Sequence, residues 1–303
     1  INAYAADMET VFAILPSYAG EDLELVADNA GARFRLWSPQ AEAVKVLIYP
    51  TDRNSSPIDT IGLTKNDNGT WSGHIAKNLI GKFYTFRVKH NGKWLKETPG
   101  VWAKAVGTNG ERAAIINFAA TNPAGWDQDR GPALKSINDA VLYEMHHRDF
   151  SMHPSSGIVN KGKFLALTEE GTRSLLGDKT GIDHLKELGV THVHILPSYD
   201  YNSVDETQLP SNQYNWGYDP FNYNAPEGSY STNPADPTAR VKEMKEMVKA
   251  LHDASIGVVM AVVYNHTSLN DDSNFSLTAP GYYYRPRPDG SYSDASGCGN
   301  ETA

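Results

Sequence analysis

The apolar pattern of this chain changes once, at a proline- and glycine-rich stretch between residues 122 and 132. Before it, short runs alternate apolar and polar residues, which is typical of strands with one buried face. After it, apolar runs of strand length alternate with segments whose apolar residues recur every three to four positions, as in helices. This change predicts an all-β domain followed by an α/β domain.

The alternating region extends from Leu23 to about Phe118. Its strands are expected at Arg33–Trp37, Ala43–Tyr49, Thr70–Ile75 and Phe83–Lys89. Asn91-Gly92 lies between two of the alternating runs and predicts a tight hairpin. Together these signals favour a β-sandwich of about 100 residues. We therefore divide the chain into an N-terminal segment (1–22), the sandwich (23–118), a linker (119–137) and an α/β domain (138–303).

The α/β domain follows a strand and helix alternation. Strands are expected at Ala140–Met145, Thr191–Leu196 and Gly257–Tyr264, and helices at Gly181–Leu188 and Thr238–His252, with Thr238 as N-cap. The uniformly apolar run Val258–Val263 is typical of a parallel strand covered on both faces. A (β/α)₈ barrel takes about 250 residues, so we expect residues 138–303 to form only its first part, about strands 1 to 3.

Composition excludes several classes of protein. Lys+Arg 27 against Asp+Glu 36 gives a net charge of -9, so nucleic acid and anionic membranes are poor partners. No apolar run approaches the roughly 18 residues that span a bilayer. Cys298 is the single cysteine, so the fold has no internal disulfide. Residues Ile1–Met8 have neither the basic region nor the apolar core of a signal peptide, and we assign no compartment.

Polar and aromatic residues gather where the second and third strands of the α/β domain end. Tyr214–Pro220 lies in a long aromatic loop, and Asn265 and His266 follow the third strand. Barrel sites lie at this end of the strands. Flat aromatic rings suit the C–H faces of a sugar, and amide, carboxylate and imidazole groups bind its hydroxyls. The pattern predicts a sugar site; the alternatives are a self-packed aromatic loop and a histidine satisfied at a strand end.

These motifs support a family resemblance. The string Tyr214-Asn215-Trp216-Gly217-Tyr218-Asp219-Pro220 resembles the signature of type I pullulanases, debranching members of the α-amylase superfamily (glycoside hydrolase family 13). Val258–Thr267 resembles the first conserved region of that superfamily, and Leu142–Ser151 resembles its first barrel strand. Phe34–Pro39 and Ala103–Gly107 are similar to segments of the carbohydrate-binding module of family 48 that precedes such barrels.

The resemblance implies roles for six residues. Tyr218 would stack under the glucose ring next to the cleaved bond, and His266 would hydrogen-bond the primary hydroxyl region of that ring. The other implied roles are shaping the cleft (Asn215, Trp216), holding the loop (Asp219) and positioning the cleft or a calcium ion (Asn265). Ala261 stands where the family has Asp, which weakens the implied role of Asn265 and of calcium.

The implied reaction is hydrolysis of α-1,6-glucosidic linkages in pullulan, starch-derived dextrins or glycogen. A retaining glycosidase needs two carboxylates about 5 to 5.5 Å apart. In the resembled family these residues follow later barrel strands, so we expect the nucleophile Asp and the acid/base Glu beyond Ala303 and assign no catalytic residue here. Nothing in the pattern places two of the present carboxylates, such as Asp200 and Glu206, opposite each other.

Further expectations concern ligands and alternatives. The resemblance implies that no cofactor is required and that calcium binding is possible. The partners it implies are an α-glucan and the remainder of the barrel, as a continuing or a cleaved chain. We assign no metal ligands: His146 and His147 are adjacent on an expected strand and would point to opposite faces. The alternative functions are a non-catalytic carbohydrate-binding polypeptide or fragment and, among enzymes, isoamylase or branching enzyme.

Overall fold

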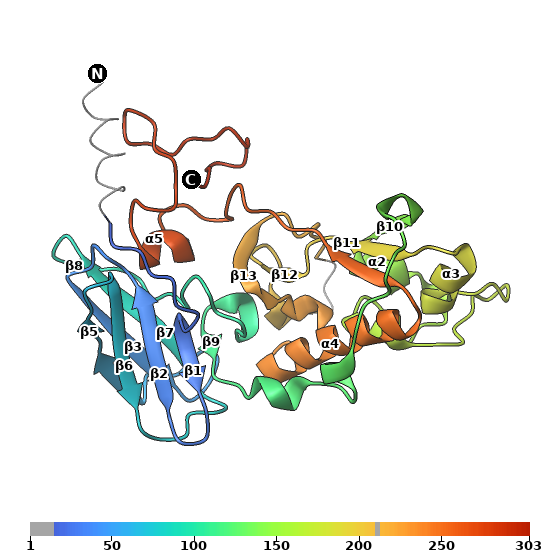
Figure 1. Cartoon of the computed structure of the whole chain (residues 1–303), viewed down its shortest axis with the longest axis horizontal. Coiled ribbons are helices and arrows are strands. Elements are labelled where there is room, and N and C mark those ends of the chain that lie inside the picture. The colour runs from blue at the N-terminus through green and yellow to red at the C-terminus, as the bar shows by residue number, and fades with distance from the viewer. Residues whose placement is uncertain (1–14, 210–212) are drawn as a thin grey trace.

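The structure is a computed structural model that describes residues 15–209 and 213–303. Figure 1 shows an antiparallel β-sandwich on one side and an α/β part on the other, with the C-terminal segment passing over both. This is the predicted fold class: a sandwich followed by an incomplete barrel. No helix among the described residues is long and apolar enough to cross a membrane.

The sandwich consists of two antiparallel sheets. One has the order β1-β2-β6-β5, and the other has the order β4-β3-β7-β8, with β9 also pairing with β7. The strands are β1 (Glu24–Ala27), β2 (Ala32–Trp37), β3 (Ala43–Tyr49), β4 (Asp59–Gly62), β5 (Thr64–Lys65), β6 (Thr70–Ile75), β7 (Phe83–His90), β8 (Lys93–Trp94) and β9 (Ala113–Ala114). The four strands predicted from alternation are thus all present, with ends that differ by one residue at most.

The sandwich core explains this agreement. The apolar positions of the alternating strands, among them Phe34, Val46 and Phe86, face one shared core and are almost fully buried. The predicted hairpin joins β7 to β8, and Asn91 and Gly92 adopt φ of 50° and 73°. Both residue types tolerate this left-handed conformation, which a two-residue hairpin turn requires.

The α/β part is built on a parallel sheet with the order β10-β11-β14. Its strands are β10 (Leu142–Met145), β11 (His192–Ile195) and β14 (Gly257–Met260), and β12 (Tyr199–Tyr201) pairs antiparallel with β13 (Pro220–Pro226) beside it. The helices are α2 (His147–Met152), α3 (Gly181–Leu188), α4 (Pro237–Asp253) and α5 (Asn274–Thr278). Three parallel strands do not close into a barrel.

Several details of the α/β part differ from the sequence prediction, and β10 and β11 are each two residues shorter than expected. The third strand ends at Met260 instead of Tyr264, and Val262 and Tyr264 are exposed, so the run is not covered on both faces. A strand can extend only as far as a neighbour pairs with it, and the apolar run itself does not show this. Helix α4 is capped by Asp236, which accepts from the N–H of Thr238, so the predicted cap at Thr238 is wrong.

Short 3₁₀ helices connect these elements. They are Thr108–Gly110, Phe118–Thr121, Trp126–Gln128, Ile137–Asp139, Pro154–Ser156, Phe164–Thr168, Glu206–Gln208 and Gly228–Tyr230. The segment between the sandwich and β10 follows α4, and Lys245 Nζ donates to Thr121 Oγ1 and Asn122 Oδ1, both at 2.7 Å. His252 of the same helix lies 2.6 Å from the carboxylate of Asp129. Helix α4 therefore anchors this connecting segment.

The C-terminal segment ties the two parts together. Helix α5 lies against the sandwich in Figure 1, and Thr98 donates to the side chain of Asn274 at 2.8 Å. Ser38 Oγ donates to the carbonyl of Thr278 at 2.6 Å, and the Trp37 and Tyr282 rings meet edge to face. The sandwich thus supports the segment that follows β14 and carries the candidate site residue His266.

Candidate functional site

The loop Tyr214–Pro220 is a tight turn held by its own side chains. Asn215 Oδ1 accepts from the N–H of Gly217 at 2.8 Å, and Asn215 Nδ2 donates to Asp219 Oδ1 at 2.7 Å. Gly217 adopts φ +85°, and a Cβ there would lie 2.8 Å from the carbonyl oxygen of Pro197. The turn therefore requires both a left-handed backbone and close approach to the end of β11, which glycine permits.

Three aromatic side chains of this loop are exposed. Tyr214 is 49% exposed and donates its hydroxyl to Asp149, whereas Trp216 (60% exposed) and Tyr218 (42% exposed) present their rings to solvent. Large aromatic side chains are normally covered, since each buries 150 to 250 Å² in a packed protein. An exposed pair on a rigid turn is therefore a candidate surface for a ligand with a flat apolar face.

His266 lies directly behind Tyr218. Its Nε2 is 2.8 Å from the carbonyl oxygen of Tyr218, and its Nδ1 is 3.3 Å from Asn265 Oδ1. Tyr223 donates its hydroxyl to the His266 carbonyl at 2.5 Å. The ring is buried, with 6% exposed, whereas Asn265 is exposed. The structure therefore brings Tyr218, Asn265 and His266 together, with His266 bonded to protein; its implied contact with a sugar hydroxyl stays a prediction.

Asp219 connects the loop to Ser203, in the segment that follows β12. Its Oδ2 accepts from the N–H of Ser203 at 2.8 Å and from the Ser203 hydroxyl, while its Oδ1 accepts from Asn215. Three of the six predicted residues, Asn215, Trp216 and Asp219, thus share the turn with Tyr218. Trp216 takes part in none of the described hydrogen bonds or ring contacts of this turn.

Sequence reasoning missed His146, which packs behind the same loop. The strand β10 ends at Met145, so His146 is the N-cap of α2 rather than a strand residue. His146 Nε2 lies 2.8 Å from the carbonyl oxygen of Asn215, and the Tyr214 ring lies 5.1 Å from the imidazole. His147 instead contacts Ser198 Oγ at 3.0 Å, so the two imidazoles are directed at different partners. Burial lowers the pKa of His147 to about 3 and keeps it neutral.

Three carboxylates meet in the interior, which corrects the expectation that none would be paired. Asp200, Glu206 and Glu227 have oxygens within 4.8 Å of one another and are fully buried. Arg240 lies 2.9 Å from Glu206 and 3.4 Å from Asp200. Burial and the neighbouring carboxylates raise the pKa of Asp200 and of Glu227. The spacing resembles that of a retaining glycosidase, but a buried group that faces a guanidinium cannot reach a sugar.

The same cluster is the place where a calcium ion would find oxygen ligands. Within residues 15–209 and 213–303, this is the one group of three acidic or histidine side chains close enough to hold a metal. Calcium takes six to eight oxygens, and here the guanidinium of Arg240 already supplies the positive charge. Asn265 does not belong to this group. The side chains of the Asp200, Glu206 and Glu227 cluster therefore do not fit a calcium site.

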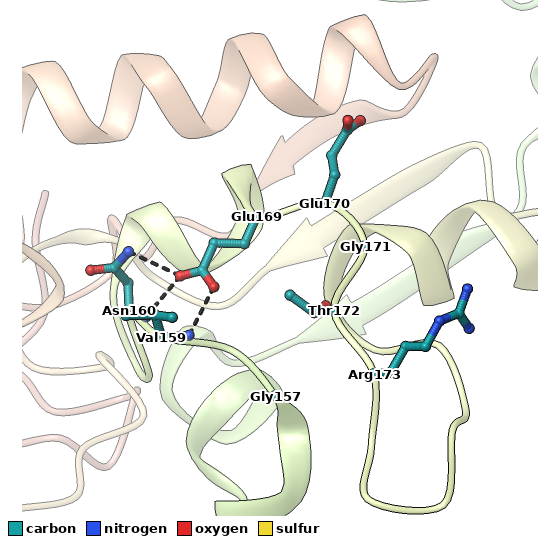
Figure 2. A pocket seen from close by; sticks show the side chains of 8 residues that line it. All are labelled: Gly157, Val159, Asn160, Glu169, Glu170, Gly171, Thr172 and Arg173. Atoms are coloured by element: carbon teal, nitrogen blue, oxygen red, sulfur yellow. Dashed lines mark hydrogen bonds between the residues drawn. The ribbon is translucent and has the colours of Figure 1, made fainter.

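A hollow of about 650 Å³ lies beside the segment 157–173 (Figure 2). Glu169 is directed at its wall, where it accepts from the N–H of Val159 at 2.8 Å and the N–H of Asn160 at 2.7 Å. The remaining lining residues are Gly157, Glu170, Gly171, Thr172 and Arg173. No aromatic ring lines this hollow and none of the six predicted residues does, so it lacks the features of the loop site.

Comparison with known proteins agrees with this architecture. The family "Carbohydrate-binding module 48 (Isoamylase N-terminal domain)" matches residues 22–108, and the family "Alpha amylase, catalytic domain" matches residues 117–279. The pullulanase of Bacillus subtilis (strain 168) is 39% identical over 270 residues, which cover 89% of this chain and 36% of the relative. Pullulanase 1, chloroplastic, of Arabidopsis thaliana is 32% identical, with 90% and 32% covered.

Solved structures agree with this relationship. A pullulanase from Paenibacillus barengoltzii, in complex with maltohexaose and alpha-cyclodextrin, superposes with a TM-score of 0.93 at 48% identity, covering 96% of this chain and 45% of that one. The chain spans about a third of the length of the curated pullulanases described above. The chain matches the family 48 carbohydrate-binding module ahead of the catalytic domain and is similar to pullulanases over most of its length; with its catalytic-domain match extending over more than half of its residues, the chain belongs to the alpha-amylase family.

Proposed function

We propose that this chain forms the glucan-binding side of an enzyme of the pullulanase type, which hydrolyses α-1,6-glucosidic linkages in pullulan, starch-derived dextrins or glycogen. One observation carries the proposal: the rigid turn that presents Trp216 and Tyr218 to solvent beside His266. The related Paenibacillus barengoltzii pullulanase is described in complex with maltohexaose and alpha-cyclodextrin, which supports an α-glucan as ligand.

In the proposed site, the two exposed rings offer flat apolar faces to glucose units. Tyr218 stacks on the ring next to the cleaved bond, Trp216 and Asn215 border the cleft, and Asp219 keeps the turn in place. His266 and Asn265 supply polar atoms toward the hydroxyls of the same ring. The nucleophile and the acid/base belong to no residue that we assign in this chain, so the chain alone is expected to bind without hydrolysis.

The reaction is a retaining double displacement in which one carboxylate attacks the anomeric carbon and a second protonates the leaving oxygen. It needs no organic cofactor. The division into residues 1–22, 23–118, 119–137 and 138–303 remains part of the proposal. So does the assignment of the remaining barrel, continuing or cleaved, as the partner that completes the active site.

The first test measures maltotriose binding to the 303-residue chain by isothermal titration calorimetry. We expect saturable binding that weakens about five- to tenfold in Trp216→Ala or Tyr218→Ala, since one aromatic stack contributes about 1 to 1.5 kcal/mol. Trp94→Ala is the matched control, because Trp94 is a comparably exposed indole on the sandwich. Equal affinity in all three variants would rule out the loop as the binding surface.

The second test measures hydrolysis by the full-length polypeptide. Maltotriose released from pullulan supports the pullulanase assignment, whereas turnover of glycogen without turnover of pullulan favours isoamylase. A branching enzyme would transfer chains without net release of reducing ends. The isoamylase alternative has a relative of its own, isoamylase 1 of rice (Oryza sativa subsp. japonica), at 27% identity, which is below that of the pullulanases.

A second candidate function is carbohydrate binding by the sandwich alone. The sandwich bears three tryptophans that could contact a glucan, Trp37, Trp71 and Trp94. Trp71 is buried and donates to the carbonyl of Ser38 at 2.9 Å, and Trp37 donates to the carbonyl of Pro16 at 3.0 Å. The Lys45 ammonium lies over the Trp94 ring, 4.6 Å from its centre. These contacts occupy Trp37 and Trp71, whereas Trp94 stays 39% exposed. We favour the loop site because it presents two exposed rings together on one turn; glucan binding abolished by Trp94→Ala would reverse this preference.

A further inference from the structure

Two histidines hold the Tyr214–Pro220 loop by its main chain. His146, just after β10, has its Nε2 2.8 Å from the carbonyl oxygen of Asn215. His266, beyond the end of β14, has its Nε2 2.8 Å from the carbonyl oxygen of Tyr218. The two strands flank β11 in the sheet. Trp216 thus lies between two residues, Asn215 and Tyr218, whose carbonyl groups are each held by a histidine.

The hydrogen bonds of His146 define which ring nitrogen carries the proton. The N–H of Asp149 donates to Nδ1 at 3.4 Å, so Nδ1 has a free lone pair and the neutral ring carries its proton on Nε2. Nε2–H therefore donates to the Asn215 carbonyl. The imidazole is 7% exposed, and the Tyr230 hydroxyl lies 3.1 Å from the same nitrogen. The donor is thus oriented by its partners and largely buried.

The bond from His146 acts at Asn215, the second residue of the turn. Asn215 uses its own side chain to accept from the Gly217 N–H and to donate to Asp219. A displacement of the Asn215 backbone would therefore move the groups that close the turn on both sides of Trp216. Nothing in this chain of contacts requires His146 to touch a ligand.

We propose that His146 is a positioning residue for glucan binding: its Nε2–H fixes the Asn215 carbonyl and so presents Trp216 and Tyr218 to the sugar. The inference deepens the proposed function and rests on it for the identity of the ligand. Its structural content, the control of the loop by His146, stands independently of any ligand. The two parts are therefore tested separately.

The first experiment follows the loop without a ligand. Hydrogen exchange of the peptide that spans residues 213–219 is measured in the parent chain, His146→Ala and His146→Gln. We expect exchange at least about tenfold faster in the Ala variant, because the carbonyl loses its donor. The Gln variant retains an N–H donor on a side chain of similar reach and is expected to stay near the parent. Unchanged exchange in His146→Ala would overturn the proposal.

The second experiment measures maltotriose affinity by calorimetry together with the melting temperature. We expect His146→Ala to weaken binding at least about tenfold and His146→Gln to restore it to within about threefold of the parent. A purely structural role predicts a lower melting temperature with unchanged affinity in the folded protein. His153→Ala, at an exposed histidine after α2, is the matched control and is expected to bind like the parent.

The outcomes separate the two proposals. Failure of the parent chain to bind maltotriose overturns the proposed function, while hydrogen exchange still decides the role of His146. Binding by the parent and by His146→Ala with equal affinity overturns the positioning role alone. Where His146→Ala does not fold, His146→Asn replaces it, because its shorter amide does not reach the Asn215 carbonyl, and the same weakening is expected.

Discussion

Arg240 donates from Nη2 to Glu206 Oε2 at 2.9 Å, and neither side chain is more than 2% exposed. The same nitrogen lies 3.3 Å from the carbonyl oxygen of Gly107, in the loop between β8 and β9 of the sandwich. Asn109 of that loop donates its N–H to Glu206 at 2.8 Å and accepts the N–H of Glu206 at the same distance. One buried ion pair therefore joins the sandwich to the α/β part.

Replacing Arg240 is predicted to destabilise the whole chain. Arg240→Met leaves Asp200, Glu206 and Glu227 together in the interior without a cation. Breaking a buried ion pair from one side costs about 3 to 5 kcal/mol, and we expect a loss of that size in urea unfolding. The control is Arg285→Met, which breaks an exposed pair with Glu301 and is expected to cost under about 1 kcal/mol. Similar losses in both variants would contradict the prediction.

Glu24 is predicted to make stability fall as pH rises. Burial raises the pKa of Glu24 to about 8 from an ordinary value of 4.5, although Trp102 donates its N–H to Oε1 at 2.6 Å. The folded state thus retains a proton that the unfolded chain releases. The stabilising contribution of this group is complete below pH of about 4.5 and is lost as pH rises to about 8.

The variant Glu24→Gln removes this titration. As pH rises from about 5 to about 8, the parent is expected to lose about 3 kcal/mol or more of unfolding free energy relative to the variant, because only the parent has a Glu24 carboxyl that must stay protonated. Urea unfolding at four pH values across that range measures it. Glu21→Gln, at an exposed neighbour, should follow the parent at every pH. A constant difference between Glu24→Gln and the parent would show that Glu24 does not titrate in this range.

Tyr199 carries a buried hydroxyl with no hydrogen-bond partner among the described residues. Burial raises the pKa of this phenol and keeps it neutral. Tyr199→Phe removes an unsatisfied polar group, so we expect unchanged or slightly higher stability, by up to about 1 kcal/mol. Tyr230→Phe is the comparison, because the Tyr230 hydroxyl lies 3.1 Å from His146 Nε2 and its removal should destabilise by about 1 kcal/mol. Thermal melts decide the prediction, and a larger loss for Tyr199→Phe than for Tyr230→Phe would contradict it.

The sequence predicts the sandwich better than the α/β sheet for a physical reason. Strands such as Ala32–Trp37 have one covered face, and the alternation of apolar and polar residues marks that face within the strand itself. The end of β14 at Met260 depends instead on its pairing with β11 (Ile195 with Met260), which lies far away in sequence. The apolar run to Val263 therefore predicted a longer strand than the sheet supports.

In the candidate site, too, local motifs are visible in the sequence, whereas contacts between residues distant in the sequence are not. The aromatic string Tyr214–Pro220 and the pair Asn265-His266 are visible as motifs, and the structure places them in contact through Tyr218 and His266. The bond from His146 to Asn215 joins residues that are 69 positions apart, and the ion pair of Arg240 with Glu206 joins residues that are 34 positions apart. No local pattern marks such pairs. Arg240 in particular lies on a helix where a charged side chain would ordinarily predict an exposed position.

Gly217 is predicted to be essential to the presentation of Trp216 and Tyr218. Gly217→Ala adds a Cβ at φ +85° that would lie 2.8 Å from the Pro197 carbonyl oxygen and 2.9 Å from the Pro197 Cβ, so the turn must shift. We expect at least about tenfold weaker maltotriose binding and a stability loss of about 1 to 3 kcal/mol. Gly171→Ala is the control that separates backbone strain from the steric clash with Pro197, since Gly171 has φ +72° but no atom within 4 Å of an added Cβ. Gly171→Ala should cost about 1 kcal/mol without affecting affinity. If calorimetry finds the same affinity for both variants, the close approach to Pro197 does not control the loop.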